Sequence, residues 1–483
     1  MKSINCLLIC NNPVDTLKTI QQIKQSPFVK TIYLLVKDAS IQAEGCESIV
    51  IDTLQSSATV RKIAEKADTD YTLIYTKDSV LDLGQFALER FQHIAEDTQA
   101  GLVYSDYYEI KNGIRSAHPN IDYQEGSLRD DFNFGSVLFY NSQLLKQAVA
   151  ETTENYQFAG FYNLRLKVSQ QADLIHINEF LYTEIELDTR KSGEKQFDYV
   201  DPRNRAVQIE MEAACTDHLK KIGGYLTPSF KKIEFNETNF PVEASVIIPV
   251  KNRVKTISDA IQSVLIQKTI FPFNLIIIDN YSNDGTSELI QKFAQKGQRI
   301  IHLIPERKDL GIGGCWNVGV HDKRCGKFAV QLDSDDVYQD ENTLQKIVNA
   351  FYEQNCAMVV GSYTMTNFAM ETIAPGLIDH KEWTPDNGRN NALRINGLGA
   401  PRAFYTPILR DIKVPNTSYG EDYALGLRIS REYQIGRIYE SLYLCRRWED
   451  NSDASLDVIK MNTNNLYKDK IRTVELKARK RIS

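Results

Sequence analysis

Three carboxylates follow a short apolar run in the second half of this chain. Residues 329–332 read Ala-Val-Gln-Leu, and Asp333, Asp335 and Asp336 come within the next four positions. Carboxylate oxygens clustered where a strand ends are hard ligands of the kind that Mg²⁺ and Mn²⁺ prefer. A solvated acidic loop is the alternative, but the cluster stands in an ordered series of motifs that begins at Ser245. We therefore predict a divalent metal site here.

A second acidic pair, Glu421 and Asp422, precedes a stretch with helical periodicity at residues 423–430. A carboxylate at the N-terminus of a helix is stabilised in its charged form by the helix dipole. The pair therefore suits proton abstraction, and plain capping of the helix is the alternative interpretation.

Alternating strands and helices are expected to hold these acids in place. In the second half, strands are predicted at residues 244–250, 275–278, 300–304 and 328–332, with helices at 257–264 and 287–296. This order is typical of parallel βαβ units, whose ligands bind beyond the carboxyl ends of the strands. Residues 249–252, Asp279 and Asp333 all lie at such ends.

The first half of the chain repeats the same plan. Its predicted strands are 5–9, 31–36, 49–51 and 71–75, with a helix around 17–23. Asp78 corresponds to Asp335, residues 162–169 correspond to 423–430, and residues 177–182 correspond to 438–443. Similar spacing over so long a stretch indicates a tandem duplication.

The two copies differ where chemistry is expected. Lys37 takes the place of Asp279, Thr76 and Lys77 take the places of Asp333 and Ser334, and Gly160-Phe161 replaces Glu421-Asp422. Apolar strand positions persist while acids are lost, as expected of a copy that kept its fold without its reaction. The first half is therefore predicted to be non-catalytic.

The chain is expected to divide into four segments. Residues 1–190 form the degenerate domain, 191–242 a helical linker, 243–455 the catalytic domain, and 456–483 a basic helix or tail. In the linker, Asp201-Pro202 and Gly223-Gly224 are start and stop signals for a helix. The basic tail is expected to be a solvated helix, with weak attraction to an anionic membrane surface as the alternative.

Composition excludes several classes of protein. The chain has 483 residues, room for roughly two to four domains, and its formal net charge of −6 argues against nucleic-acid binding. Its eight cysteines include no Cys-x-x-Cys pair, so free thiols in a reducing cytosol are expected instead of a zinc site. Neither a signal peptide nor an apolar run of about 18 residues is evident, so a cytoplasmic protein without a transmembrane segment is predicted.

The motifs resemble those of family-2 glycosyltransferases with the GT-A fold. The resemblance rests on residues 245–252, 276–286, 311–319, 332–336 and 420–423, in the order and spacing of that family, and extends to about residue 452. Residues 101–113 resemble a stretch that some members carry after their metal motif. The resemblance implies an α/β protein of two tandem GT-A-like, nucleotide-diphospho-sugar transferase domains, each a mostly parallel sheet flanked by helices.

The resemblance also implies roles for individual residues. The base of a nucleotide sugar, with uridine favoured, is expected at Pro249, Val250 and Asp279, with a turn-capping role as the alternative for Asp279. Asp335 is expected to hold Mn²⁺ or Mg²⁺ against the diphosphate, with Asp333 at the ribose or a metal-bound water. The expected catalytic base is Asp422, and Glu421 is the second candidate. Further donor-site residues are expected to be Asn252, Gly311, Asn317, Ser334, Arg446 and Arg447.

Acceptor recognition is expected between the metal and base motifs, from Trp383, Asn396, Gly397 and Arg402. A Trp face and mixed hydrogen-bonding groups suit a sugar ring, although Trp383 has an equal claim as a core residue.

Two points stay open in the closing motif. Trp448 stands where the family often has a histidine, so the third protein ligand of the metal is undetermined. For Arg446 and Arg447, pairing with Glu449 or Asp450 is the ordinary alternative to binding phosphate.

Together these predictions describe an inverting, metal-dependent glycosyltransferase, with inversion implied by the resemblance. Its donor is a nucleotide-diphosphate sugar, and its acceptor a glycan, a lipid-linked group or a protein; peripheral membrane contact would run through the basic tail. The main alternative is a non-catalytic carbohydrate-binding or scaffolding protein. A sugar-nucleotide pyrophosphorylase is disfavoured because residues 249–253 contain no glycine, and an NAD site because the glycines at 311–314 are not on a first strand-to-helix turn.

Overall fold

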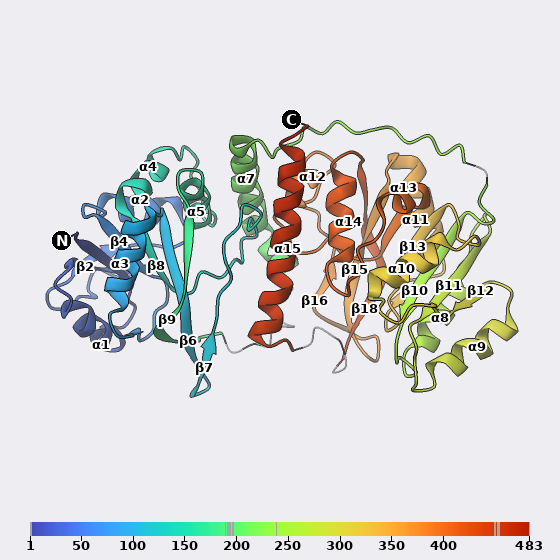
Figure 1. Ribbon diagram of the computed structural model, residues 1–483, viewed down its shortest axis with the longest axis horizontal. Helices are drawn as coiled ribbons and strands as arrows, with labels where there is room; N and C mark the ends of the chain where they lie inside the picture. The colour runs from blue at the N-terminus through green and yellow to red at the C-terminus, as the bar shows by residue number, and fades with distance from the viewer. Residues whose placement is uncertain are drawn as a thin grey trace. The chain divides into compact units, whose positions relative to one another are not determined.

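The structure is a computed structural model that describes residues 2–188, 190, 195, 198–237, 239–448, 451 and 455–482. The chain separates into two compact units (Figure 1). Unit 1 contains residues 1–191, 206–224 and 456–473, and unit 2 contains residues 192–205, 225–455 and 474–483. The predicted boundary between residues 190 and 191, and the residues Glu449 and Asp450, involve positions outside the described residues.

Unit 1 is built around one mixed sheet. Its strands are β1 (Ile4–Ile9), β2 (Val29–Val36), β3 (Glu47–Val50), β4 (Tyr71–Tyr75), β5 (Asp82–Leu83), β6 (Leu102–Lys111), β7 (Ile114–His118), β8 (Val137–Asn141) and β9 (Leu174–Ile185). They lie in the order β3-β2-β1-β4-β8-β6-β9-β5, with β7 beside β6. Strands β1 to β4 pair in parallel, whereas β8 is antiparallel to both β4 and β6.

Unit 2 repeats this topology strand for strand. Its strands are β10 (Ala244–Val250), β11 (Phe273–Asp279), β12 (Ile300–Leu303), β13 (Phe328–Gln331), β14 (Val337–Tyr338), β15 (Met358–Asn367), β16 (Thr372–Ile378), β17 (Arg402–Tyr405) and β18 (Ile435–Arg447). Their order is β12-β11-β10-β13-β17-β15-β18-β14, with β16 beside β15. The matching order confirms the predicted duplication. The expectation of mostly parallel sheets is corrected, because β17 returns antiparallel to β13 and β15.

Helices cover the sheets and connect the strands (Figure 1). Those of the first copy are α1 (Pro13–Lys24), α2 (Ser57–Glu65), α3 (Ala87–Thr98), α4 (Ser142–Ala150) and α5 (Gly160–Ser169). Those of the second copy are α8 (Ile257–Leu265), α9 (Thr286–Lys296), α10 (Ile312–His321), α11 (Thr343–Gln354), α12 (Gly388–Asn391), α13 (Thr406–Ile412) and α14 (Glu421–Ser430). Between them lie the short turns η1 (Asp198–Val200) and η2 (Pro202–Asn204) and the helix α7 (Arg205–Ile222), and α15 (Val458–Arg479) comes last.

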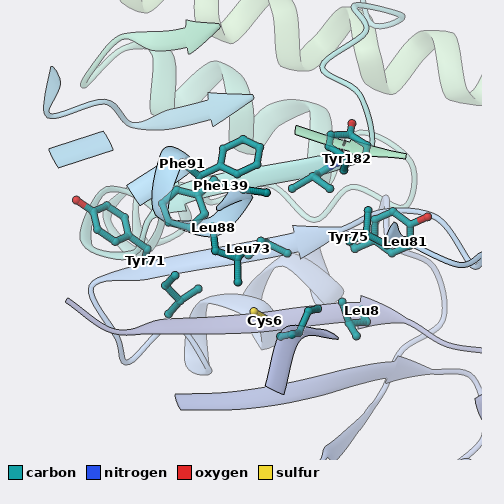
Figure 2. Close-up of a cluster of buried hydrophobic side chains, with 14 of the residues drawn as sticks. Cys6, Leu8, Tyr71, Leu73, Tyr75, Leu81, Leu88, Phe91, Phe139 and Tyr182 are labelled. Atoms are coloured by element: carbon teal, nitrogen blue, oxygen red, sulfur yellow. Dashed lines mark hydrogen bonds between the residues drawn. The ribbon is translucent and has the colours of Figure 1, made fainter. Parts of the chain in front are cut away.

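The core of unit 1 shows why its apolar runs became strands. Cys6 and Leu8 of β1 point to one face of the sheet, where Phe91 of α3 and Phe139 of β8 also pack (Figure 2). Leu7, between them in sequence, belongs to a second cluster, because successive side chains of a strand point to opposite faces. Both faces of the parallel strands are therefore buried, which explains their continuous apolar sequences.

Two helices between and after the copies test the linker and tail predictions. The carboxylate of Asp201 accepts the backbone N–H of Arg203 at 2.9 Å, and Gly223 has a φ of +77°, so the start and stop signals acted as expected. Helix α15 differs from the solvated helix that its charge suggested. Arg472 and Arg479 are fully buried, because each pairs with an acid on the same helix.

Within the described residues, no helix combines the length and the apolar character that crossing a bilayer requires.

Candidate active site

One cavity of about 300 Å³ opens in unit 2 at the carboxyl ends of β10 and β13. The predicted site residues in its wall are Pro249, Asp333, Ser334, Asp335, Arg402, Glu421, Asp422, Arg446 and Arg447. These residues come from β10, the loop after β13, β17, α14 and β18, so the fold gathers segments that are far apart in the sequence.

The loop after β13 presents three carboxylates to this cavity. Asp333 accepts the side-chain amide of Gln331 at 2.8 Å, and its backbone N–H donates to the hydroxyl of Tyr443 at 3.0 Å. Asp336 has a structural role, because its carboxylate accepts the backbone N–H of Arg446 at 2.7 Å. One oxygen of Asp335 accepts two N–H groups, from the Trp448 ring at 3.3 Å and from Asn451 at 3.2 Å.

The charges of these acids suit a cation. Burial and the charge of Asp335 raise the pKa of Asp336 well above its usual value. Burial also raises the pKa of Asp333, against the opposing effect of Arg402. A bound divalent ion would relieve this repulsion. Among the described residues, no three His, Cys, Asp or Glu side chains form a ready-made metal cluster. The residues thus fit an ion held by Asp335 and Asp333 whose other ligands come from a bound diphosphate.

The second acidic pair sits at the start of α14, as the sequence predicted. Asp422 forms an ion pair with Nη1 of Arg402 at an N–O distance of 2.9 Å. Glu421 faces the cavity with a buried Oε2 that has no hydrogen-bond partner in the described part of the chain. Burial, together with the neighbouring charge of Asp422, raises the pKa of Glu421 to about 8. Glu421 is therefore mostly protonated at neutral pH.

Arg446 is a buried cation held rigidly at the cavity wall. It is 1% exposed, and its Nη1 donates to Asp259 of α8 at 2.7 Å while its Nε donates to the carbonyl of Asp335. Its Nη2 is buried without a hydrogen-bond partner among the described residues. A fixed guanidinium with one unused N–H group suits a phosphate oxygen.

Several predicted nucleotide-binding residues lie elsewhere. Asp279 is fully buried, and its carboxylate accepts the backbone N–H of Ser282 at 2.9 Å and the hydroxyl of Ser287. Although burial opposes ionisation, these bonds and one from His302 hold the pKa of Asp279 below its ordinary value. The carboxylate accepts hydrogen bonds within the protein, as the turn-capping alternative expects, and the base-binding role stays a prediction.

Val250 and Asn252 are likewise structural. Val250 is buried in the sheet at 3% exposure, where it pairs with Asp279. Asn252 adopts a φ of +55°, and its side-chain oxygen accepts the backbone N–H of Asn283 at 2.9 Å. Asn252 therefore ties two loops together and is not in the cavity wall.

The glycine motif of α10 packs against protein instead of ligand. The backbone N–H of Gly311 donates to Asn416 at 2.8 Å, and a Cβ on Gly313 would lie 1.9 Å from the carbonyl oxygen of Pro415. Asn317 forms two hydrogen bonds with the backbone of Val414, at 2.7 and 3.0 Å. The loop after α13 thus lies against both residues, and their contact with the nucleotide stays a prediction.

The predicted acceptor residues separate in the structure. Trp383 is 2% exposed, with the guanidinium of Arg437 over its ring at 5.5 Å, so it is a core residue. Asn396 and Gly397 are half-buried and are not in the cavity wall. Arg402 alone of this group lines the cavity.

The cavity wall also contains residues that sequence reasoning missed. Gln331 is the last residue of β13, two positions before Asp333, so its closeness to the predicted acids could have indicated it. Asn451 lies in the closing motif, where attention to its amide as a donor would have found it. The remaining missed residues are Arg253, Ile312, Trp316, Phe404, Val414, Leu425 and Cys445.

The corresponding place in unit 1 is occupied by an internal ion pair. Lys77 donates to the buried carboxylate of Glu184 and lies 3.5 Å from Glu186, both at the end of β9. Asp78, the counterpart of Asp335, accepts the backbone N–H and the side-chain amide of Asn11 at 3.1 and 2.7 Å. A fixed ammonium group and a satisfied carboxylate thus stand where unit 2 has acids facing a cavity.

Comparison with known proteins identifies the family of part of unit 2. Residues 245–404 match the model described as glycosyl transferase family 2. These residues form a glycosyltransferase family 2 domain within unit 2. Unit 1 has the same strand order as unit 2.

The family-2 domain has relatives in bacteria. An uncharacterized glycosyltransferase of Rickettsia felis is 31% identical over 203 residues, which are 41% of this chain and 32% of the relative. Glycosyltransferase GlyG of Streptococcus pneumoniae is 27% identical over 119 residues, or 25% of this chain and 38% of the relative. This chain therefore spans about a third of the length of the curated relatives that it matches.

Among solved structures, the crystal structure of residues 1–349 of S. aureus TarS in complex with UDP-GlcNAc is similar to part of the chain. The two share 20% sequence identity, with a TM-score of 0.37, over 48% of this chain and 70% of that one.

Proposed function

We propose that unit 2 transfers a sugar from a nucleotide-diphosphate sugar to an acceptor hydroxyl, with inversion at the anomeric carbon. One observation carries the proposal: Asp335, after β13, and Asp422, at the start of α14, line the same cavity. One carboxylate suits the diphosphate end of a donor and the other suits proton abstraction from an acceptor. Membership of family 2 supports the same chemistry.

The donor end of the cavity is assigned to the diphosphate. Arg446 offers its unused Nη2, and Arg447 lies beside it in the wall. Asp335, with Asp333, would hold Mn²⁺ or Mg²⁺, which when bound supplies positive charge to the departing nucleoside diphosphate. Trp448 and Asn451 hold one oxygen of Asp335 and leave its other oxygen for this purpose.

At the acceptor end, Asp422 is assigned as the base that takes the proton from the attacking hydroxyl. The ion pair with Arg402 holds its carboxylate in one orientation. Glu421 is not suited to the same task, because with a pKa of about 8 it is mostly protonated at neutral pH. A protonated Glu421 instead donates a hydrogen bond to a sugar oxygen.

Unit 1 is assigned a non-catalytic role, since Lys77 neutralises the acids of its corresponding site. The acceptor is a glycan, a lipid-linked group or a protein. The second candidate function, a scaffold that binds carbohydrate without turnover, predicts the same donor binding but no reaction.

The test begins with the full chain, Mn²⁺ and a panel of UDP- and GDP-sugars. Thermal shift identifies the donor, and release of the nucleoside diphosphate measures slow hydrolysis or transfer. Asp422→Asn is expected to abolish turnover while it preserves donor binding, whereas Asp335→Ala is expected to weaken binding only in the presence of metal. Asp411→Asn, at an exposed acid of α13, is the matched control. Donor binding without any release of nucleotide by the wild type would favour the scaffold.

A further inference from the structure

Arg402 lies near both Asp333, an acid assigned to the donor end of the cavity, and Asp422, the acid assigned to the acceptor end. It is the first residue of β17, which pairs with β13 through Val330 and Ala403. Because Asp333 follows β13 directly, β17 brings Arg402 close to the donor-side acids. Its guanidinium reaches in the other direction, to Asp422 at the start of α14.

The contacts of Arg402 fix both ends of the residue. Its backbone N–H donates to the side-chain oxygen of Gln331 at 3.2 Å, and the amide group of the same Gln331 donates to Asp333 at 2.8 Å. Its Nη1 donates to the carbonyl oxygen of Gly399 at 2.7 Å and forms an ion pair with Asp422 at an N–O distance of 2.9 Å. The side chain is only 18% exposed, so little freedom is left for it to follow a substrate.

The acids around the Arg402 guanidinium favour a permanent positive charge at this position. Asp422, Asp333 and Glu421 all lie near this guanidinium, and although burial opposes its charge, these acids raise the pKa of Arg402. A lysine would supply charge, but its ammonium group lacks the planar guanidinium whose N–H groups point in fixed directions. The residue therefore combines charge balance with a defined direction.

We propose that Arg402 is a positioning residue that holds the Asp422 carboxylate toward the acceptor hydroxyl, and does not itself bind the acceptor. This replaces the sequence-based expectation that Arg402 recognises the acceptor. The inference rests on the proposed function, because it assigns a task to Arg402 only if Asp422 is the base. Arg402 is also connected to Asp333, because its backbone N–H and the Asp333 carboxylate both bond to the side chain of Gln331. Groups on the donor side and the acceptor side are therefore held by the same hydrogen-bonded residues.

The two roles for Arg402 predict different kinetics. A residue that positions the base affects the chemical step, so Arg402→Met is expected to lower kcat about 100-fold, the size of loss that follows a misplaced reacting group. The KM for the acceptor should change less than about threefold, because ground-state binding is untouched. Arg402→Lys, which keeps the charge, should recover part of kcat. Arg307→Met, at a surface arginine that is 72% exposed, is the control and should match the wild type.

A double-mutant cycle separates positioning from a general structural effect. In the Asp422→Glu background, which keeps a carboxylate base and so leaves turnover to measure, Arg402→Met is expected to lower kcat less than in the wild type, because the longer side chain has already lost its defined pairing with Arg402. Unfolding in urea, followed by tryptophan fluorescence, shows whether Arg402→Met is folded. If it is not, the cycle is run with Arg402→Lys, for which the same loss of coupling to Asp422 is expected.

The outcomes distinguish this inference from the proposed function. A raised acceptor KM at unchanged kcat, or an equal loss in both backgrounds, would overturn the positioning role while leaving the transferase intact. If the wild type neither transfers nor hydrolyses any donor sugar, the proposed function fails and Arg402 loses its assigned task with it.

Discussion

The raised pKa of Glu421 predicts an unusual dependence of stability on pH. A carboxyl group whose pKa rises from 4.5 in the unfolded chain to about 8 in the folded unit binds its proton more tightly when folded. Its contribution to stability is therefore present below pH 4.5 and is lost as the pH rises toward 8. The loss is about 1.4 kcal/mol per pH unit, so raising the pH from 6 to 7.5 should lower the free energy of unfolding by about 2 kcal/mol.

The substitution Glu421→Gln removes the titrating group and keeps the shape of the side chain. The quantity to compare is the free energy of unfolding of the variant minus that of the wild type. We expect this difference to be about 2 kcal/mol larger at pH 7.5 than at pH 6, in favour of the variant. Some pH dependence should persist, because burial also raises the pKa values of Asp333 and Asp336. Glu353→Gln, at an exposed position of α11, is the control and should follow the wild type.

The assay can be confined to the relevant unit. The chain has three tryptophans, Trp316, Trp383 and Trp448, and all of them lie within unit 2. Urea unfolding followed by tryptophan fluorescence at a series of pH values therefore reports on that unit. If Glu421→Gln and the wild type lose stability in parallel as the pH rises, Glu421 is ionised in the folded protein and the reasoning about its protonation is wrong.

Two further predictions concern the cations of the two units. Arg446→Lys should weaken binding of a nucleoside diphosphate about tenfold, measured by calorimetry with Mn²⁺, because an ammonium group cannot hold Asp259 and a phosphate at once. Unchanged affinity would remove Arg446 from the donor site. Lys77→Met should destabilise unit 1 by about 3–5 kcal/mol, because it leaves the buried Glu184 charge without its partner. Hydrogen exchange of β9 measures this, and sugar transfer by unit 2 should be unaffected.

Much of the fold followed from local sequence. The strands at 244–250 and 71–75 are found at the predicted residues, because a continuous apolar run between polar turns has few other stable states. Asp201 and Gly223 also lie at the predicted start and end of a helical segment, since capping depends only on the nearest few backbone groups. The mixed pairing of the sheets was missed, because the sequence of a short apolar strand does not show whether the strand runs parallel or antiparallel to a distant partner.

The candidate site was predictable in part, for a related reason. Asp335 and Asp422 belong to motifs of defined order, and both line the cavity. Asp279 and Asn317 carry the right chemical groups, but nearby backbone atoms and side chains already use those groups. Whether a polar side chain is used by the protein or offered to a ligand depends on neighbours brought by folding.

The sequence by itself determined that the chain holds two copies of one α/β plan, and that acids survive in only one of them. Those facts depend on residue types and on their order, which are written in the chain. Only the tertiary structure decided that Arg402 faces Asp422, that Trp383 is buried, and that Lys77 pairs with Glu184. Each of these depends on contacts between distant segments, and the energy of a buried charge is set by the partner it meets there.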